Sequence, residues 1–451
     1  MLNIKKVWDL LISGKDMELI KFPPKEDWNK LLERPVMNFE EIEDRVKPIL
    51  TRVAEEGDKA LKAFTATYDK VEIEELLVSK YEIKEAEKKV DKDLQTAIKI
   101  AKSNIEKFHV VQKELVRKVE TMPGVTCWRK SIPIDKVGLY IPGGTAPLFS
   151  TVLMLGIPAV LAGCKEVILC TPPDKNGEIH PAILYTASLI GIDKIFKVGG
   201  AQGVAAMAFG TESVPKVNKI FGPGNQYVTA AKQLVTKTGV AIDMPAGPSE
   251  VAVIADASAN PDFIASDLLS QAEHGVDSQV LLVTNDKKLP KKVVKSLNEQ
   301  LEDLPRKEFA IKALENSKTI LMKDMEGILE LINQYAPEHL IISTENAEEL
   351  GEQITNAGSV FLGHLTPESV GDYASGTNHT LPTNGYANVY SGVSLDSFFK
   401  KVTFQKITEK GLENIGKAVE LMAEAESLHA HKNAVTLRLK KIKEDKIKDK
   451  I

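Results

Sequence analysis

The sequence predicts an α/β protein with parallel sheets and helical regions at both ends of the chain. Short apolar runs rich in β-formers, each bounded by Gly or Pro, alternate with helical patterns from about residue 133 onward. That alternation is typical of βαβ units. Residues 1–120 instead repeat apolar residues at helical spacing among many charges. From Leu395 the pattern is helical again and ends in a Lys-rich segment.

The composition favours an ordinary cytoplasmic globular protein. The chain has 451 residues, enough for two or three domains, with 43% hydrophobic and 27% charged residues. A net charge of −5 argues against nucleic acid as the main partner. No apolar run is long enough for a membrane span, and the charged start lacks a signal-peptide core. Three cysteines are too few for a disulfide framework, so we expect a reducing compartment.

The amino-terminal region is expected to be mostly helical. Residues 38–41 resemble a capping box and predict a helix that runs towards Gly57. Residues 83–116 repeat apolar side chains at helical spacing, and their many charges are typical of a solvated face.

Two sets of strands are predicted in the middle of the chain. The first set lies at 137–141, 166–170, 194–198 and 219–221, and each strand leads into a Gly- or Pro-rich turn. The second set lies at 250–255, 279–284 and 340–343. The two sets could be related modules, although no convincing sequence repeat connects them.

One glycine-rich turn is a candidate nucleotide site. Residues 199–206 follow a strand and open a helix of small residues, whose free amides could receive a phosphate. The glycine spacing departs from the dinucleotide fingerprint, and no acidic residue closes the strand at Phe221 to take a ribose hydroxyl. Close packing of helix against sheet explains the same glycines, so both interpretations stay open.

Scarce histidines gather in the second half of the chain beside potential metal ligands. Gln271 and His274 are three residues apart near the end of a predicted helix, between Pro261 and Gly275, and therefore share one face. With these, Asp372 and His431 offer nitrogen and oxygen donors that suit zinc.

A second pair offers proton chemistry. Glu338 and His339 are adjacent, and such a pair can move protons and activate water. A lone Glu-His dipeptide is more often a surface feature. The thiols are weaker candidates, because Cys164 and Cys170 flank an apolar strand and suit a buried position. Cys127, beside Trp128, is ambiguous.

Eight collinear motifs resemble the histidinol dehydrogenase family. They span most of the chain between residues 125 and 440, and they are long enough to be highly specific. They lie at 137–144, 199–202, 221–225, 243–250, 270–275, 336–339, 369–376 and 430–435.

The resemblance implies the last step of histidine biosynthesis. A member of this family oxidises L-histidinol to L-histidine through L-histidinal and uses two NAD. It implies that Gln271, His274, Asp372 and His431 bind one zinc per subunit, that Glu338 activates water and that His339 shuttles protons. Substrate contacts would include Ser249, Gln271, His274, His339, Asp372, His379, Glu426 and His431, and NAD contacts Tyr140, Gln202 and Asn225.

The resemblance also implies two incomplete Rossmann-like domains and a homodimer with shared active sites. We expect a helical extension over 1–36, a first α/β domain from 37–138 with 250–393, and a second over 139–249 on the NAD side. A helical dimerisation segment would cover 394–451. No nucleic-acid or membrane partner is expected.

Two alternatives remain from the residues alone. A thiol-dependent aldehyde dehydrogenase would use Cys127 or Cys164 as nucleophile, and Cys→Ala variants with intact turnover would exclude it. A non-redox zinc protein would use the same ligands without reducing NAD.

Overall fold

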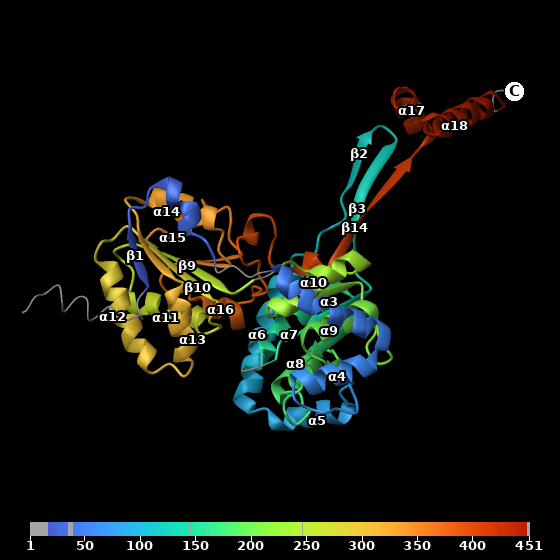
Figure 1. The fold of residues 1–451 in the computed structure, drawn as a ribbon. Helices are drawn as coiled ribbons and strands as arrows, with labels where there is room; N and C mark the ends of the chain where they lie inside the picture. Colours follow the sequence, from blue (N-terminus) through green and yellow to red (C-terminus); the bar gives the residue numbers. More distant parts are fainter. Residues whose placement is uncertain (1–16, 35–38, 144–145, 246, 449–451) are drawn as a thin grey trace, which may run out of the picture. The chain divides into compact units, whose positions relative to one another are not determined.

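The computed structural model describes residues 17–34, 39–143, 146–245 and 247–448. The chain divides into two compact units. The first combines Met1–Gln112 with Ile134–Phe398, and the second combines Lys113–Pro133 with Phe399–Ile451. The first unit contains two parallel sheets covered by helices, which is the predicted α/β architecture (Figure 1).

A six-stranded parallel sheet forms the core of one half of the first unit. Its spatial order is β1-β11-β10-β9-β12-β13. The strands are β1 (Glu18–Lys21), β9 (Glu250–Ala255), β10 (Gln279–Thr284), β11 (Lys318–Leu321), β12 (His339–Ser343) and β13 (Ser359–Leu362).

Alternating side chains bury both faces of this sheet. Val251 and Val253 of β9 pack with α11 (Pro261–Ala272), α12 (Leu289–Glu302) and α13 (Lys307–Glu315). Ala252 and Ile254 lie in the opposite cluster, with α14 (Met325–Tyr335), α15 (Ala347–Gly351) and Trp28 of α2 (Trp28–Leu31). A strand buried on both faces reads as a continuous apolar run, which is why the sequence marks β9 and β10 so clearly.

A five-stranded parallel sheet forms the other half. Its order is β6-β5-β4-β7-β8. The strands are β4 (Lys136–Tyr140), β5 (Glu166–Thr171), β6 (Lys194–Lys197), β7 (Lys219–Phe221) and β8 (Ala241–Ile242). Both sheets share one topology, because each places its third, second, first, fourth and fifth strands side by side, and β1 joins the larger sheet as an extra edge strand. The two predicted strand sets are therefore related in topology.

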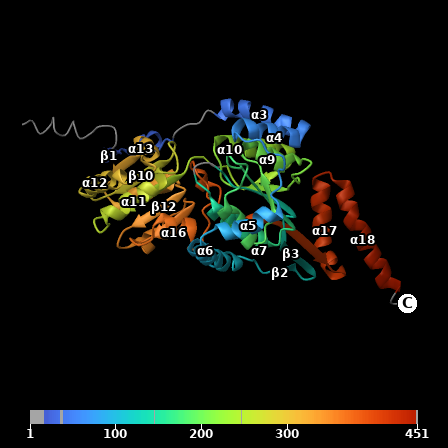
Figure 2. The same cartoon turned by 90° about the horizontal axis from the view of Figure 1, so that it is seen from below.

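Helices from the amino-terminal region cover the five-stranded sheet. Helix α3 (Phe39–Glu56) packs with α9 (Gly200–Phe209) and α10 (Gln226–Val235), and Figure 2 shows these helices together. Side chains of α3 and of α4 (Asp58–Tyr68) share one core with this sheet. We expected residues 37–138 to form one domain with 250–393, which contains the six-stranded sheet. The buried core instead joins α3 and α4 to the five-stranded sheet. Asn38, the expected cap of α3, lies outside the described residues.

Two further helices replace the single helical stretch expected at 83–116. Helix α5 (Lys80–Lys89) ends before Asp91, whose side chain caps α6 (Lys92–Val110) by accepting from two backbone N–H groups. Helix α5 packs with α8 (Pro181–Leu189), and α6 packs with α7 (Phe149–Ala162).

The second unit is a three-stranded antiparallel sheet with a helical hairpin. Strand β3 (Val125–Pro133) pairs with β2 (Lys118–Met122) and with β14 (Phe399–Ile407). Helices α17 (Glu409–Ala425) and α18 (His429–Lys448) lie side by side. Strand β14 lies in the segment expected to be helical. This Lys-rich segment forms a half-exposed strand because β3 supplies nine cross-strand pairs for it.

The segment expected as a helical amino-terminal extension also contains a strand. Within its described part, β1 joins the six-stranded sheet beside β11 before the short helical turns at η1 (Lys25–Asp27) and α2. Among the described residues, no helix is both long enough and apolar enough to cross a lipid bilayer.

Candidate active site

The predicted Glu338–His339 pair lies at the amino end of β12. Helix α14 is capped by Ala336, whose φ of +51° is left-handed, and Pro337 then directs the chain into the strand. Both side chains are buried, with 6% of Glu338 and 4% of His339 exposed. Because the pair is buried, the structure favours a role in proton transfer over an incidental surface position.

The first residue of β9 holds both members of this pair. The backbone N–H of Glu250 donates to Glu338 Oε2 at 2.9 Å. The backbone oxygen of Glu250 lies 3.2 Å from His339 Nδ1. Because a carbonyl oxygen only accepts, this contact places a proton on Nδ1 of the imidazole. Parallel pairing of β9 with β12 sets this alignment.

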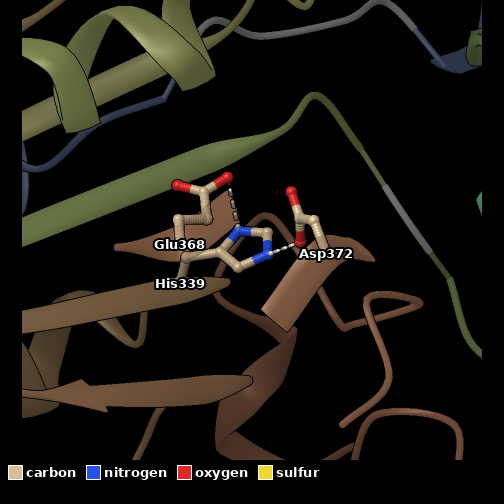
Figure 3. Close-up of side chains that lie close together, drawn as sticks. All are labelled: His339, Glu368 and Asp372. Carbon is tan, nitrogen blue, oxygen red and sulfur yellow. Dashed lines mark ion pairs between the residues drawn. The ribbon is translucent and has the colours of Figure 1, made fainter. Parts of the chain in front are cut away.

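Two carboxylates from α16 (Glu368–Tyr373) flank the imidazole (Figure 3). Glu368 Oε1 lies 3.7 Å from His339 Nδ1, and Asp372 Oδ1 lies 3.4 Å from Nε2. Glu368 and Asp372 are four residues apart, so they share one face of the helix. Glu338 Oε2 completes the group at 3.7 Å from Nδ1.

The crowded carboxylates control the protonation of the site. Burial raises the pKa of Glu338 to about 8. Burial also raises the pKa of Glu368 well above its ordinary value, and the charge of His339 only partly offsets this. For His339 itself burial opposes protonation, but the neighbouring carboxylates outweigh burial and hold the pKa of the imidazole well above its usual range. A carboxylate with a pKa near 8 exchanges protons readily at neutral pH.

The donor atoms at this site fit a divalent cation. His339 Nε2, Glu368 Oε2 and Asp372 Oδ1 are buried without a hydrogen-bond partner among the residues that the structure describes. Ligand atoms of these three residues lie within 4.8 Å of one another. Buried polar atoms are normally paired, and nitrogen with carboxylate oxygen suits zinc. Of the four predicted zinc ligands, only Asp372 belongs to this group.

The other predicted metal ligands of the first unit lie beside this cluster. Gln271 is buried near the end of α11, and its amide is satisfied when it donates to Glu368 Oε1 at 2.6 Å and accepts from Glu250 N at 2.8 Å. His274 follows the helix with an exposed side chain. Neighbouring protein atoms nevertheless displace part of the water around the imidazole and lower the pKa of His274, and the Asp372 carboxylate acts in the opposite direction.

The predicted substrate residue His379 is fixed in one tautomer. Its Nδ1 donates to the backbone oxygen of Asp372 at 2.9 Å, so its Nε2 accepts from Thr151 Oγ1 at 3.0 Å. Burial lowers the pKa of His379, which agrees with a neutral ring. Ser249 directly precedes Glu250 and is half-buried. The structure therefore brings both residues to the neighbourhood of the Glu338–His339 pair.

A cavity of about 1040 Å³ opens at the carboxyl edge of the five-stranded sheet. The first strand of this sheet, β4, lies between β5 and β7. The strands that follow it in sequence are therefore added first on one side of β4 and then on the other, and ligands bind at such a switch point in open α/β sheets. The three residues predicted to contact NAD, Tyr140, Gln202 and Asn225, all line the cavity. Tyr140 is the last residue of β4, and its hydroxyl accepts from the Gly200 N–H at 2.9 Å.

The last two predicted site residues belong to the second unit. Glu426 caps the carboxyl end of α17, and His431 lies in the first turn of α18. Both side chains are exposed.

Sequence reasoning missed Glu368 and Glu250. Glu368 is buried with 1% exposed, and its spacing of four residues from Asp372 was the signal available. Glu250 closes the motif at 243–250, but its role depends on backbone contacts, which leave no mark on residue type.

Comparison with known proteins gives consistent matches along most of the chain. The family model for histidinol dehydrogenase matches residues 32–439. A histidinol dehydrogenase of Bacteroides thetaiotaomicron is 64% identical over 427 residues, which covers 95% of this chain and 100% of that protein. That of Escherichia coli K12 is 52% identical, covering 93% and 98%. The crystal structure of histidinol dehydrogenase from Elizabethkingia anophelis is 57% identical, with a TM-score of 0.93, and the match covers 95% and 99% of the chains.

Proposed function

The chain belongs to the histidinol dehydrogenase family, and on that basis we propose that it oxidises L-histidinol to L-histidine through L-histidinal with two NAD and zinc. The observation that carries this proposal is the buried Glu338–His339 pair, held by Glu250 beside Asp372. A four-electron oxidation needs proton removal twice and one activated water, and this pair supplies groups for both tasks.

For the first oxidation, we propose that His339 takes the alcohol proton as hydride leaves for NAD. Nε2 is the nitrogen that exchanges this proton, because Nδ1 donates to Glu250. Since the nearby carboxylates raise the pKa of the ring, Nε2 must release its own proton before it accepts that of the alcohol. Asp372 beside Nε2 would stabilise the imidazolium that forms.

For the second oxidation, we propose that Glu338 removes a proton from the water that adds to the aldehyde. With a pKa of about 8, its ionised form is a stronger base than an ordinary carboxylate, and it exchanges protons close to neutral pH. Burial would keep bulk water away from the aldehyde and limit its escape. Hydride transfer from the hydrate to a second NAD would then give the carboxylate.

The proposed zinc ligands are Gln271, His274, Asp372 and His431. When bound, zinc would hold the imidazole and amine of the substrate and orient the carbon that loses hydride. Glu368 would act through Gln271, since its carboxylate receives the Gln271 amide and thereby sets which way the amide oxygen points.

The proposed NAD site is the cavity at the carboxyl edge of the five-stranded sheet. Its volume suits a dinucleotide, and its lining includes Tyr140, Gln202 and the amino end of α9, whose positive dipole end attracts phosphate. Ser249, His379 and Glu426 would contact histidinol. The enzyme would act in the cytoplasm as a homodimer, with His431 and Glu426 completing the partner's site.

The thiol alternative loses support at Cys164, one of its two candidate nucleophiles. Burial raises the pKa of Cys164 to about 11, and burial also raises that of Cys170. Thiols with such pKa values carry almost no thiolate at neutral pH and are poor nucleophiles.

The decisive experiment is to count NADH formed for each histidinol consumed, with zinc-loaded and exhaustively chelated enzyme. We expect two NADH, little free aldehyde, and loss of turnover on chelation that zinc restores. A yield of one NADH with aldehyde in solution would contradict the four-electron reaction. Full turnover in a sample shown to contain no metal would contradict the role of zinc.

A further inference from the structure

Glu250 connects the catalytic pair to a buried ion pair. Its backbone contacts Glu338 and His339, while its own side chain points elsewhere and is almost fully buried, with 2% of its surface exposed. A buried carboxylate without compensation is costly, so its partner matters.

The partner is Arg34, which comes from the amino-terminal segment. Arg34 Nε donates to Glu250 Oε1 at 2.5 Å, and Nη2 donates to Oε2 at 2.9 Å. Nη2 also donates to the backbone oxygen of Tyr335 at 2.7 Å, and the guanidinium lies 4.1 Å from the centre of the Tyr335 ring. This two-point contact fixes both position and orientation of the carboxylate, which a lysine cannot do.

The Arg34–Glu250 pair lies at a junction of segments that carry site residues. Tyr335 ends α14, only three residues before Glu338. The backbone N–H of Asn384 donates to Glu250 Oε1 at 2.8 Å, which ties the loop after His379 to the same carboxylate. Arg34 therefore contacts, directly or through Glu250, the backbone on both sides of the catalytic pair.

The local charge explains why a cation is needed here. The carboxylates of Glu338, Glu368 and Asp372 already surround His339. Without Arg34, the charge of Glu250 would add to this group, and the first residue of β9 would shift or take up a proton to relieve it. Because Glu250 N–H and C=O hold the catalytic pair, such a shift would move both reacting side chains, and displacements of about 1 Å cost roughly a hundredfold in rate.

We propose that Arg34 is a positioning residue for the oxidation: it clamps Glu250 so that the peptide groups of Glu250 hold Glu338 and His339 in reacting geometry. The proposal rests on the proposed function of that pair. It gives the amino-terminal segment, which contributes none of the predicted site residues, a part in the assembly of the site.

The test compares Arg34→Met, Arg34→Lys and Arg34→Ala with the wild-type enzyme. We expect Arg34→Met to lower kcat by about tenfold to a hundredfold while KM for histidinol changes less than about threefold, since geometry is lost and not the substrate contacts. Arg34→Lys should recover part of kcat through its charge alone. Millimolar guanidinium should partly restore Arg34→Ala, because the side chain it replaces is 16% exposed and the space is reachable.

Lys25→Met is the matched control. Lys25 pairs with Glu330 and joins the same amino-terminal segment to α14, but both side chains are exposed, 64% and 52%. Its kcat should stay within about twofold of wild type, as expected for a surface ion pair.

The double variant Arg34→Met with Glu250→Gln separates positioning from folding. Removing both charges removes the uncompensated carboxylate, so we expect the double variant to be more active than Arg34→Met alone. A kcat that falls only in proportion to the folded fraction, or a rise in KM at unchanged kcat, would overturn the proposal. So would losses in Arg34→Met and Lys25→Met of equal size.

Failure of the proposed function would be seen separately, as a wild-type enzyme that forms no NADH with histidinol. In that case the clamp is tested by a crystal structure of Arg34→Met. Loss of the contact between Glu250 N and Glu338 would support it, and retention of that contact would overturn it.

Discussion

At the scale of single residues, the proposed chemistry depends on carboxylates in unequal surroundings. Glu338 is buried and has a pKa of about 8, whereas Asp372 interacts with His339, which outweighs burial and lowers its pKa. One carboxylate can therefore accept a proton near neutral pH while the other stays charged. Such divergence of neighbouring acids is typical of sites that move protons.

A second buried acid gives a pH prediction away from the proposed metal site. Asp69 lines the cavity of the five-stranded sheet, and burial raises its pKa to about 6 from an ordinary 3.8. Between about pH 4 and 6, Asp69 is therefore mostly protonated in the folded protein and mostly ionised in the unfolded chain. The charged Asp69 therefore destabilises the fold above pH 6, and this cost disappears as the pH falls to 4.

We expect Asp69→Asn to raise the free energy of unfolding by about 1 kcal/mol at pH 8 and by nothing near pH 4, a value reduced because the carboxylate is half-exposed. Urea unfolding at both pH values measures this. Asp174→Asn is the control in the same cavity, since its carboxylate accepts two backbone N–H groups and its loss should not stabilise. A gain for Asp69→Asn that is equal at both pH values would contradict the assignment.

Residue types pointed to Glu338, His339, Asp372, Gln271 and His274 as candidates, and the family resemblance added Ser249 and His379, but neither pointed to the supporting residues. Glu338 and His339 could be found because their side chains act directly, and the structure brings them together with Asp372. Arg34 and Glu250 could not, because they act through a bidentate ion pair between residues 216 apart and through a peptide contact between residues 88 apart. No local pattern records such a contact.

At the scale of elements, one buried ion pair holds the turn beside the proposed NAD site. Lys232 of α10 pairs with Asp243, with only 4% and 1% of their side chains exposed. Lys232 Nζ also donates to Gly222 O at 2.8 Å, and Gly222 N donates to Asp243 Oδ2 at 2.8 Å. Gly222 has a φ of +134°, and a Cβ there would lie 2.1 Å from the backbone oxygen of Tyr140, so the turn depends on glycine and on this pair.

We expect Lys232→Met to lower the free energy of unfolding by about 3–5 kcal/mol, because it leaves the Asp243 charge buried and unpaired. KM for NAD should also rise, since Gly222 leads into Asn225. Denaturant unfolding and initial-rate kinetics measure the two effects. Lys237→Met, at an exposed position in the same region, should change neither. A loss below about 1 kcal/mol would show that the pair does not hold the turn.

Helices and strands were predicted best where burial requires a clear pattern of apolar residues. The central strands β4, β5, β9 and β10 are continuous apolar runs and were found within one residue of their ends. Edge strands such as β1 and β13 are short, and β14 alternates Lys with apolar residues on a half-exposed sheet. Their pairing depends on distant partners, so the local sequence does not reveal them.

At the scale of the whole molecule, the proposed homodimer makes a quantitative prediction. Glu338 lies in the first unit and His431 in the second. If His431 serves the partner's site, a mixed dimer of Glu338→Gln and His431→Ala has one doubly altered site and one intact site. With random pairing, half the dimers are mixed, so about a quarter of wild-type activity should return in a two-fold symmetric dimer.

Co-expression of the two inactive variants, with mixed dimers confirmed by mass, provides the measurement. Each variant expressed alone is the control and should remain inactive. Mixed dimers without activity would mean that His431 acts within its own chain.

The two parallel sheets share a strand order but carry the residues of their proposed sites at opposite ends of the strands. The five-stranded sheet forms its cavity at its carboxyl edge, whereas the six-stranded sheet presents Glu250 and His339 at the amino ends of β9 and β12. The opposite edge of that sheet therefore carries no proposed catalytic residue in its loops at 256–260, 285–288 and 344–346. Sequence drift and insertions among relatives should collect at these three loops, while their topological counterparts at 141–147, 172–180 and 222–226 stay under purifying selection.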